Sequence, residues 1–156
     1  MAIISTFTWN QSVSGFGGAI DALITSAQDG NVFPNITQEE AELGFTKYRC
    51  IYVTSDANSH IDLGIYIATP TPSIDTKIAI GLGTSGLDGI EQTPADENTA
   101  PTDVLFKYPV NTGYMVDLPD MLANQHQAIW LKLVVNADAA GADSDYCRLN
   151  VDGTQV

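Results

Sequence analysis

The sequence predicts an all-β domain folded as a single β-sandwich, and three observations support this fold class. The first is a long apolar strand pattern at residues 127–135. The second is a series of shorter alternating segments after residue 45, and the third is the turn-rich sequence between them. Short strands with period-two alternation, separated by turns, are typical of two packed antiparallel sheets. An immunoglobulin-like sandwich is the first choice, and a jelly roll is the alternative.

Length predicts one domain, because a chain of 156 residues buries about 70% of its unfolded surface. Residues 1–44 are interpreted as an irregular N-terminal segment that packs on the domain or reaches from it, and residues 45–156 as the sandwich. Thr37 followed by Glu40 has the form of a capping box, which predicts a short helix ending at Gly44.

Residues 127–135 are expected to form the central strand. Alternate side chains of a strand point to opposite faces, and one face here is wholly apolar, with Ile129, Leu131, Leu133 and Val135. Burying these four side chains contributes about 6 to 12 kcal/mol before opposing terms. The other face carries Ala128, Trp130, Lys132 and Val134. That composition predicts a surface partly covered by something else.

The other strands are expected on both sides of this one in sequence. The clearest alternation has the inward side chains Ile61, Leu63, Ile65 and Ile67. Further inward sets are Ile78, Ile80 and Leu82, then Val104, Phe106 and Tyr108, and finally Cys147, Leu149 and Val151. Two loops, residues 83–102 and 136–145, have no periodicity, and loops of this length are typical of binding surfaces or of disorder.

Charge limits the classes of partner. Six basic and 19 acidic residues give a net charge of −13, so duplex nucleic acid and anionic membranes are not expected as partners. The chain has no run of about eighteen apolar residues that would predict a membrane-spanning helix. The N-terminal residues lack the pattern of a secretory signal, so folding in a cytoplasm is expected. Cys50 and Cys147 are then expected as core thiols, with a bridge between sheets as the alternative.

Catalytic and cofactor motifs are not found, so a non-enzymatic protein without cofactor or metal is expected. The two histidines, His60 and His126, lie in different loops, and no nucleophile elbow or phosphate-binding loop occurs. Two acidic groups suit calcium by residue type but not by spacing, and they are interpreted as ordinary acidic surface. They are Asp56, Asn58 and Asp62, and Asp138, Asp143 and Asp145.

Three aromatic residues of the N-terminal segment are candidate interface anchors. They are Trp9, Phe16 and Phe33, and a small sandwich formed by residues 45–156 does not necessarily cover them. Large aromatic side chains near glycine-rich backbone are typical anchors of protein interfaces. The alternative is that they fold back over the open end of the sandwich.

Three groups of residues carry a resemblance to a known family. They are residues 17–20 with 31–33 and 48–53, residues 80–83 with 90–93 and 95–101, and residues 127–130 with 149–153. In this order and spacing, they resemble a family of structural proteins from tailed bacteriophages and prophages. The resemblance covers most of the chain from about residue 13 onward and supplies no catalytic residues.

The resemblance implies a virion component with a β-sandwich fold. The leading expectation is a capsid decoration or cement protein, made in the host cytoplasm, that stabilises the head from its outer surface. Its partners would be the major capsid protein or other virion proteins, and a homo-oligomer, with a trimer favoured, is expected. The alternatives are a neck or tail structural protein, or a receptor-binding module of the tail that binds glycan.

Overall fold

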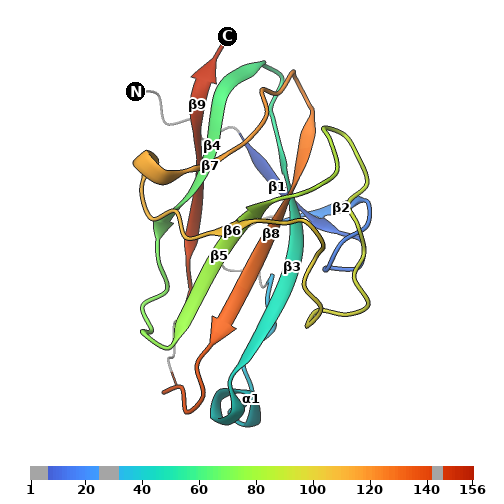
Figure 1. Ribbon diagram of the computed structural model, residues 1–156. Helices are drawn as coiled ribbons and strands as arrows, with labels where there is room; N and C mark the ends of the chain where they lie inside the picture. The colour runs from blue at the N-terminus through green and yellow to red at the C-terminus, as the bar shows by residue number, and fades with distance from the viewer. Residues whose placement is uncertain (1–6, 25–31, 142–145) are drawn as a thin grey trace.

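The protein folds as two antiparallel sheets packed face to face, as the computed structural model of residues 7–24, 32–141 and 146–156 describes (Figure 1). The larger sheet has the order β2 (Ile20–Leu23), β1 (Thr8–Ser12), β3 (Phe45–Thr54), β8 (His126–Val135), β5 (Thr76–Leu82) and β6 (Phe106–Lys107). The smaller sheet has the order β7 (Val116–Asp117), β4 (His60–Thr69) and β9 (Arg148–Gln155). The predicted all-β sandwich is confirmed.

The chain crosses repeatedly between the two sheets. β3 and β5 belong to the larger sheet, whereas β4 between them belongs to the smaller one, and β8 is likewise flanked in sequence by β7 and β9. Such crossings place strands that are distant in sequence side by side, as Greek-key connections do. The choice of an immunoglobulin-like winding over a jelly roll stays a prediction.

β8 is the centre of the larger sheet, as its sequence pattern predicts. It pairs along its whole length with β3, from Thr54↔His126 to Phe45↔Val135, and on its other side with β5. Its four inward aliphatic side chains all lie in the core between the sheets. The opposite side of this core comes from the smaller sheet, with Leu63, Ile65, Ile67, Val116 and Val151.

The described part of residues 1–44 is more regular than the sequence indicates. Within them, β1 and β2 form a hairpin, and β1 continues the larger sheet by pairing with residues 51–54 of β3. The register of the β1–β2 pairing shifts between Asn10 and Ser12, where the strand has an irregularity. A bulge of this kind hides a strand from a period-two search.

The short helix α1 (Gln38–Leu43) confirms the predicted capping box. The Glu40 amide donates to Thr37 Oγ1 at 3.2 Å, and the Thr37 amide donates to Glu40 Oε2 at 2.9 Å. The helix ends at Gly44, whose φ of +71° favours glycine. Among the described residues, no helix is long and apolar enough to cross a membrane.

One expected strand is shorter than its pattern, and one strand of the structure was not expected. The segment 104–108 forms only the two-residue strand β6, and β7, also of two residues, had no signal in the sequence. The 3-10 turn η1 (Thr112–Tyr114) separates them. Both strands are edge strands, and an edge strand of two residues is too short for alternation to reveal.

Candidate functional site

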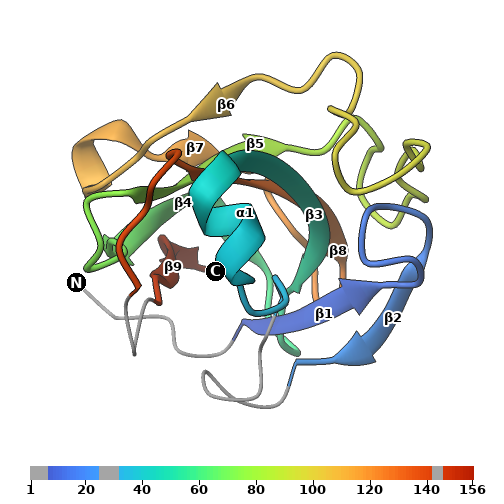
Figure 2. The same cartoon turned by 90° about the horizontal axis from the view of Figure 1, so that it is seen from below.

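The outer face of the larger sheet, turned away from the smaller sheet, carries a second and smaller core. Its buried residues are Tyr48, Cys50, Tyr52, Ala128 and Trp130. The cover comes from the β1–β2 hairpin and from the connection between β5 and β6, which we call the 83–105 loop. Figure 2 shows hairpin and loop side by side outside the larger sheet. Val104 of the loop packs so closely that a Cβ added at Gly81 would lie 2.4 Å from its Cγ1.

Glu91 fixes the middle of the loop through a buried network of hydrogen bonds. Its carboxylate accepts from Thr84 Oγ1 at 2.8 Å and from the Ser85 amide at 2.9 Å. Its own amide donates to the hydroxyl of Tyr52 at 3.1 Å, and that hydroxyl donates to the Gly18 carbonyl at 2.5 Å. Loop, hairpin and β3 are therefore joined at one point.

Three ionisable groups of this outer core have shifted pKa values. Burial alone would raise the pKa of Glu91, but the hydrogen bonds from Ser85 and Thr84 outweigh it and lower that pKa. Burial raises the pKa of the Tyr52 hydroxyl and of the Cys50 thiol, so both stay protonated at neutral pH. A neutral thiol is a poor nucleophile, so Cys50 acts as a small core residue.

Side-chain hydrogen bonds also close the loop at its stem. The Gln92 side chain accepts from the Thr102 amide at 2.7 Å and donates to the Thr102 carbonyl at 2.8 Å, as a neighbouring strand would. Nearer the tip, Asp96 accepts from the Asn98 amide and the Thr99 hydroxyl, both at 2.9 Å. These bonds lower the pKa of Asp96, and the bond from the Thr99 hydroxyl has the largest effect. The loop is thus built as a layer of fixed shape.

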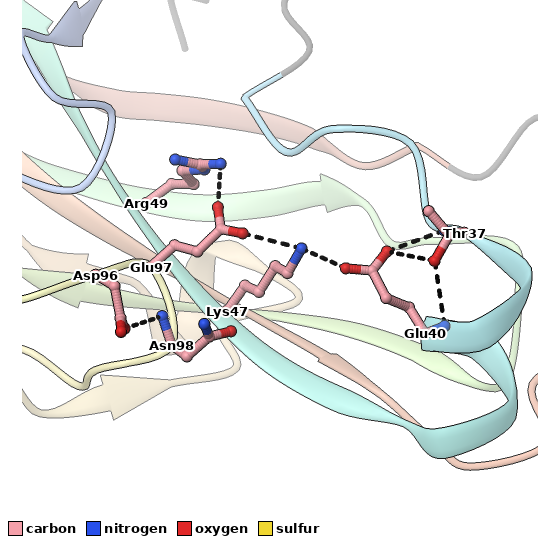
Figure 3. A network of polar contacts seen from close by, with 7 residues as sticks. All are labelled: Thr37, Glu40, Lys47, Arg49, Asp96, Glu97 and Asn98. Carbon is pink, nitrogen blue, oxygen red and sulfur yellow. Dashed lines mark hydrogen bonds and ion pairs between the residues drawn. The ribbon is translucent and has the colours of Figure 1, made fainter.

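An ion-pair cluster joins the loop to α1 through β3 (Figure 3). The ammonium group of Lys47 lies 2.6 Å from Glu40 Oε1 and 3.0 Å from Glu97 Oε1, and Arg49 pairs with the other oxygen of Glu97. Lys47 is nearly buried, which alone would lower its pKa, but the bonds to Glu40 and Glu97 raise it. The bond from Lys47 is also the main cause that lowers the pKa of Glu40. Each charged side chain in this cluster has an oppositely charged partner. The cluster is therefore suited to holding α1, β3 and the 83–105 loop together rather than to transferring protons.

Two depressions lie in the described surface. One, of about 550 Å³, lies between the end of β5 and the segment after β7, with walls of Leu82, Leu87, Leu118 and Pro119. The other, of about 390 Å³, lies beside Arg49 and Val32. Among the described residues, no group of three or more acidic, histidine or cysteine side chains is placed to hold a metal ion.

The predicted anchors Trp9, Phe16 and Phe33 are all partly buried. Trp9 and Phe33 pack against the core between the sheets, whereas Phe16 packs against the outer core. The fold therefore places them on different faces of the larger sheet and does not gather them. Their role as interface anchors stays a prediction.

The other residues considered from sequence are also dispersed. His60 is fully buried against the ring of Phe7, with its Nε2 3.8 Å from Asp56 Oδ1. Asp56 also accepts from the Asn58 amide in a local turn. Asp143 and Asp145 lie outside the described residues. Cys50 and Cys147 lie at different cores and form no disulfide with each other.

The end of the sandwich that carries α1 exposes apolar side chains that sequence reasoning missed. We call this surface the α1 end. It contains α1, the β4–β5 turn at residues 70–75 and residues 136–140. Leu43 is 72% exposed and Ile74 is 92% exposed. Backbone hydrogen bonds hold the segments together, from Asn136 to Asp75 at 2.9 Å and from Ala139 to Ala41 at 3.1 Å.

One feature of the sequence could have indicated this surface, namely the position of the apolar Ile74 in a polar turn. It lies between the proline-containing segment 70–72 and the start of β5, where no strand or helix pattern would bury it. An apolar side chain in such a turn is either covered by the fold or available to a partner. The exposure of Leu43 beside the same end has no comparable signal, because α1 has no buried residue on any face.

Comparisons with protein-family models, with curated proteins and with solved structures find no match.

Proposed function

We propose that this chain is a non-enzymatic structural protein of a tailed-phage virion, a capsid decoration protein that binds the outer surface of the head. The observation that carries the proposal is the α1 end, where Leu43 and Ile74 stand exposed on segments that hydrogen bonds hold in place. The resemblance of the sequence to virion structural proteins supplies the identity of the partner, the major capsid protein or another virion protein.

The α1 end has the properties of a binding surface. Exposed apolar side chains on a fixed backbone lose little conformational entropy when a partner covers them. Ile74 is held in a turn that is closed by a bond from Thr71 Oγ1 to the Thr76 carbonyl at 2.8 Å. Anchors of this kind, rather than the whole contact area, dominate binding free energy.

A role in binding rather than catalysis agrees with the way in which the polar side chains of the 83–105 loop are engaged. Long loops on a β-sandwich often form the walls of a ligand site. Here Glu91, Gln92 and Glu97 hold the loop against the sheet, so that its polar groups serve the fold. The protein would act by mass action, because any partner that binds and stabilises the assembled shell lowers its free energy.

Immunogold labelling of intact source virions, viewed by electron microscopy, tests the location. Gold spread over the heads is expected. Gold confined to the neck or tail would contradict the decoration role and favour the adaptor or receptor-binding alternatives. Absence of label on virions with accessible epitopes would overturn the external position.

The anchor role is tested by binding to heads that have been stripped of this protein. Ile74→Ser is expected to weaken binding by at least about tenfold, because an apolar side chain that the partner would cover becomes polar. Ile90→Ser is the matched control, since Ile90 is 73% exposed but lies at the opposite end of the sandwich. Equal binding by the two variants would contradict the use of the α1 end.

A further inference from the structure

Part of the outer face of the larger sheet is not covered by the 83–105 loop. The loop and hairpin cover the half near Trp130 and Tyr52, whereas most side chains of the half nearer the α1 end are only partly buried. The register of β3, β8 and β5 places two cross-strand rows there, Thr46 with Val134 and Lys77, and Tyr48 with Lys132 and Ala79. Except for buried Tyr48, these residues are half-buried or exposed. We call Thr46, Lys77, Ala79, Lys132 and Val134 the lysine platform.

The two lysines of the platform are available to an outside anion. Neither forms an ion pair with a carboxylate of the described residues, whereas Lys47 and Arg49 do. The ammonium group of Lys77 lies 4.3 Å from the centre of the Tyr108 ring, and that of Lys132 lies 5.9 Å from the centre of the Phe106 ring. Aromatic rings at these distances attract the cations and limit their movement. The platform thus presents two positioned positive charges.

Four exposed aspartate side chains lie at the opposite end of the molecule. We call it the acidic end, defined by the exposed residues Asp62, Asp88, Asp117 and Asp120. The segments that supply them are joined, because the Asp62 amide donates to Asp120 Oδ1 at 3.0 Å and Asp88 accepts from Gln125 and the His126 amide. Lysine and arginine are absent from residues 50–76, 78–106 and 108–131, which supply all four carboxylates.

We propose that the lysine platform of one copy binds the acidic end of a second copy. Charge complementarity carries the inference, since the platform has unpaired ammonium groups and the acidic end has carboxylates with no lysine or arginine on their segments. Apolar groups accompany the charges on both surfaces, with Ala79 and Val134 on the platform and Leu122, 65% exposed, at the acidic end. This inference rests on the proposed function in one respect, which is that the protein works as part of an assembly.

The contact has a defined symmetry consequence. It joins two different surfaces, so each copy can contribute its platform to one neighbour and its acidic end to another. A contact of this type closes into a ring when the rotation between copies permits and otherwise extends into a chain. Blocking one surface on a copy stops growth at that copy without affecting its other surface.

Sedimentation velocity of charge-reversal variants tests the contact at an ionic strength of about 0.15 M and over about 10 to 300 µM protein. The platform variant is K77E/K132E and the end variant is D117K/D120K. The matched control is K107E/R148E, which changes the net charge of −13 by the same four units as the platform variant. Lys107 and Arg148 are exposed, and they lie outside the platform on β6 and β9.

Self-association is expected for the wild-type protein and for the control. Each of the two other variants is expected to associate at least about tenfold more weakly, because like charges then face each other. Their equimolar mixture is expected to regain association, since one pair of surfaces is intact and the reversed platform and the reversed end are again opposite in charge. The neutral variants K77Q/K132Q and D117N/D120N are expected to weaken association in the same direction, and they keep the test valid if a reversal prevents folding.

Three results would overturn the inference. They are a monomeric wild-type protein over the whole concentration range, a platform variant that associates as the control does, and a mixture that does not regain association. A monomeric protein that still labels phage heads would remove the self-contact and leave the proposed function in place. Self-association of a protein that does not label virions would keep the self-contact and remove the proposed function.

Discussion

The two faces of β8 are buried in different ways. On the inner face, Ile129 and Leu131 meet a second sheet whose strands supply aliphatic side chains at regular intervals. On the outer face, Ala128 and Trp130 meet the 83–105 loop and the β1–β2 hairpin. One strand thus has an inner face covered by regular structure and an outer face covered by irregular structure. Burial of a strand face and the kind of segment that covers it are therefore separate properties.

The two covers are also held by different interactions. Between the sheets, the free energy comes chiefly from the burial of apolar side chains. On the outer face, hydrogen bonds and ion pairs of Glu91, Gln92 and Glu97 hold the loop in addition. The outer layer therefore depends on individual polar atoms, and it is the layer that acid should affect first.

Removing a large side chain from each face of β8 in turn should change stability most. Trp130→Ala is expected to cost about 3 to 5 kcal/mol of unfolding free energy and Leu131→Ala about 2 to 5 kcal/mol, because both leave buried cavities. Denaturant unfolding measures both. Only Trp130→Ala is expected to speed amide exchange at Ser85 and Glu91 more than the global loss explains. Equal loop protection in the two variants would show that the layers unfold as one.

A smaller effect is expected from one added methyl group in the loop. Gly83→Ala would place a Cβ 2.5 Å from Glu91 Oε2 and 2.7 Å from the Ala128 carbonyl oxygen, at a cost of about 1 to 3 kcal/mol. Gly86→Ala is the control in the same loop, since nothing lies within 4 Å of the added atom. It should raise stability by less than about 1 kcal/mol or leave it unchanged. Thermal unfolding of the pair measures the difference, and similar values would contradict the close packing.

The smallest expected effect concerns acid. The pKa of Glu91 is lowered in the folded protein, so its contribution to stability is fully present above the ordinary value of 4.5 and is lost as pH falls through the folded value. Glu91→Gln is expected to lower stability at pH 7 and to reduce its decline on acidification below about pH 4.5. Unfolding free energies across pH 3 to 7, in steps of about one unit, measure this. Glu39→Gln, at an exposed position on α1, is the control and should preserve the wild-type decline.

The inner layer could be predicted from sequence, and most of the outer layer could not. The alternation at 61–67 and 127–135 fixes which side chains face the core between the sheets, because the period of a strand is two. That Trp130 would need a cover was also predictable. The identity of the cover was not, since the bond between Glu91 and Tyr52 joins residues 39 positions apart in the sequence. No local pattern encodes such a contact.

The candidate binding surfaces were less predictable than the fold. The α1 end depends on Leu43 and Ile74 being left uncovered, and exposure of an apolar residue is decided by what the rest of the chain does not reach. The lysine platform depends on where the 83–105 loop stops, which is set by bonds such as Gln92 to Thr102. A sequence pattern predicts which strand faces can be buried, but the extent of the cover is a tertiary property.

The shortness of the terminal strands of the larger sheet has a consequence for behaviour at high concentration. Within the described residues, this sheet ends with β2, which has four residues, and with β6, which has two. Unpaired backbone groups at a sheet edge are templates for pairing with other chains, and natural proteins limit this hazard with short edge strands. At these two edges the chain therefore offers little surface for amyloid-like pairing and aggregation, a benefit for any protein made in many copies before it reaches its place of assembly.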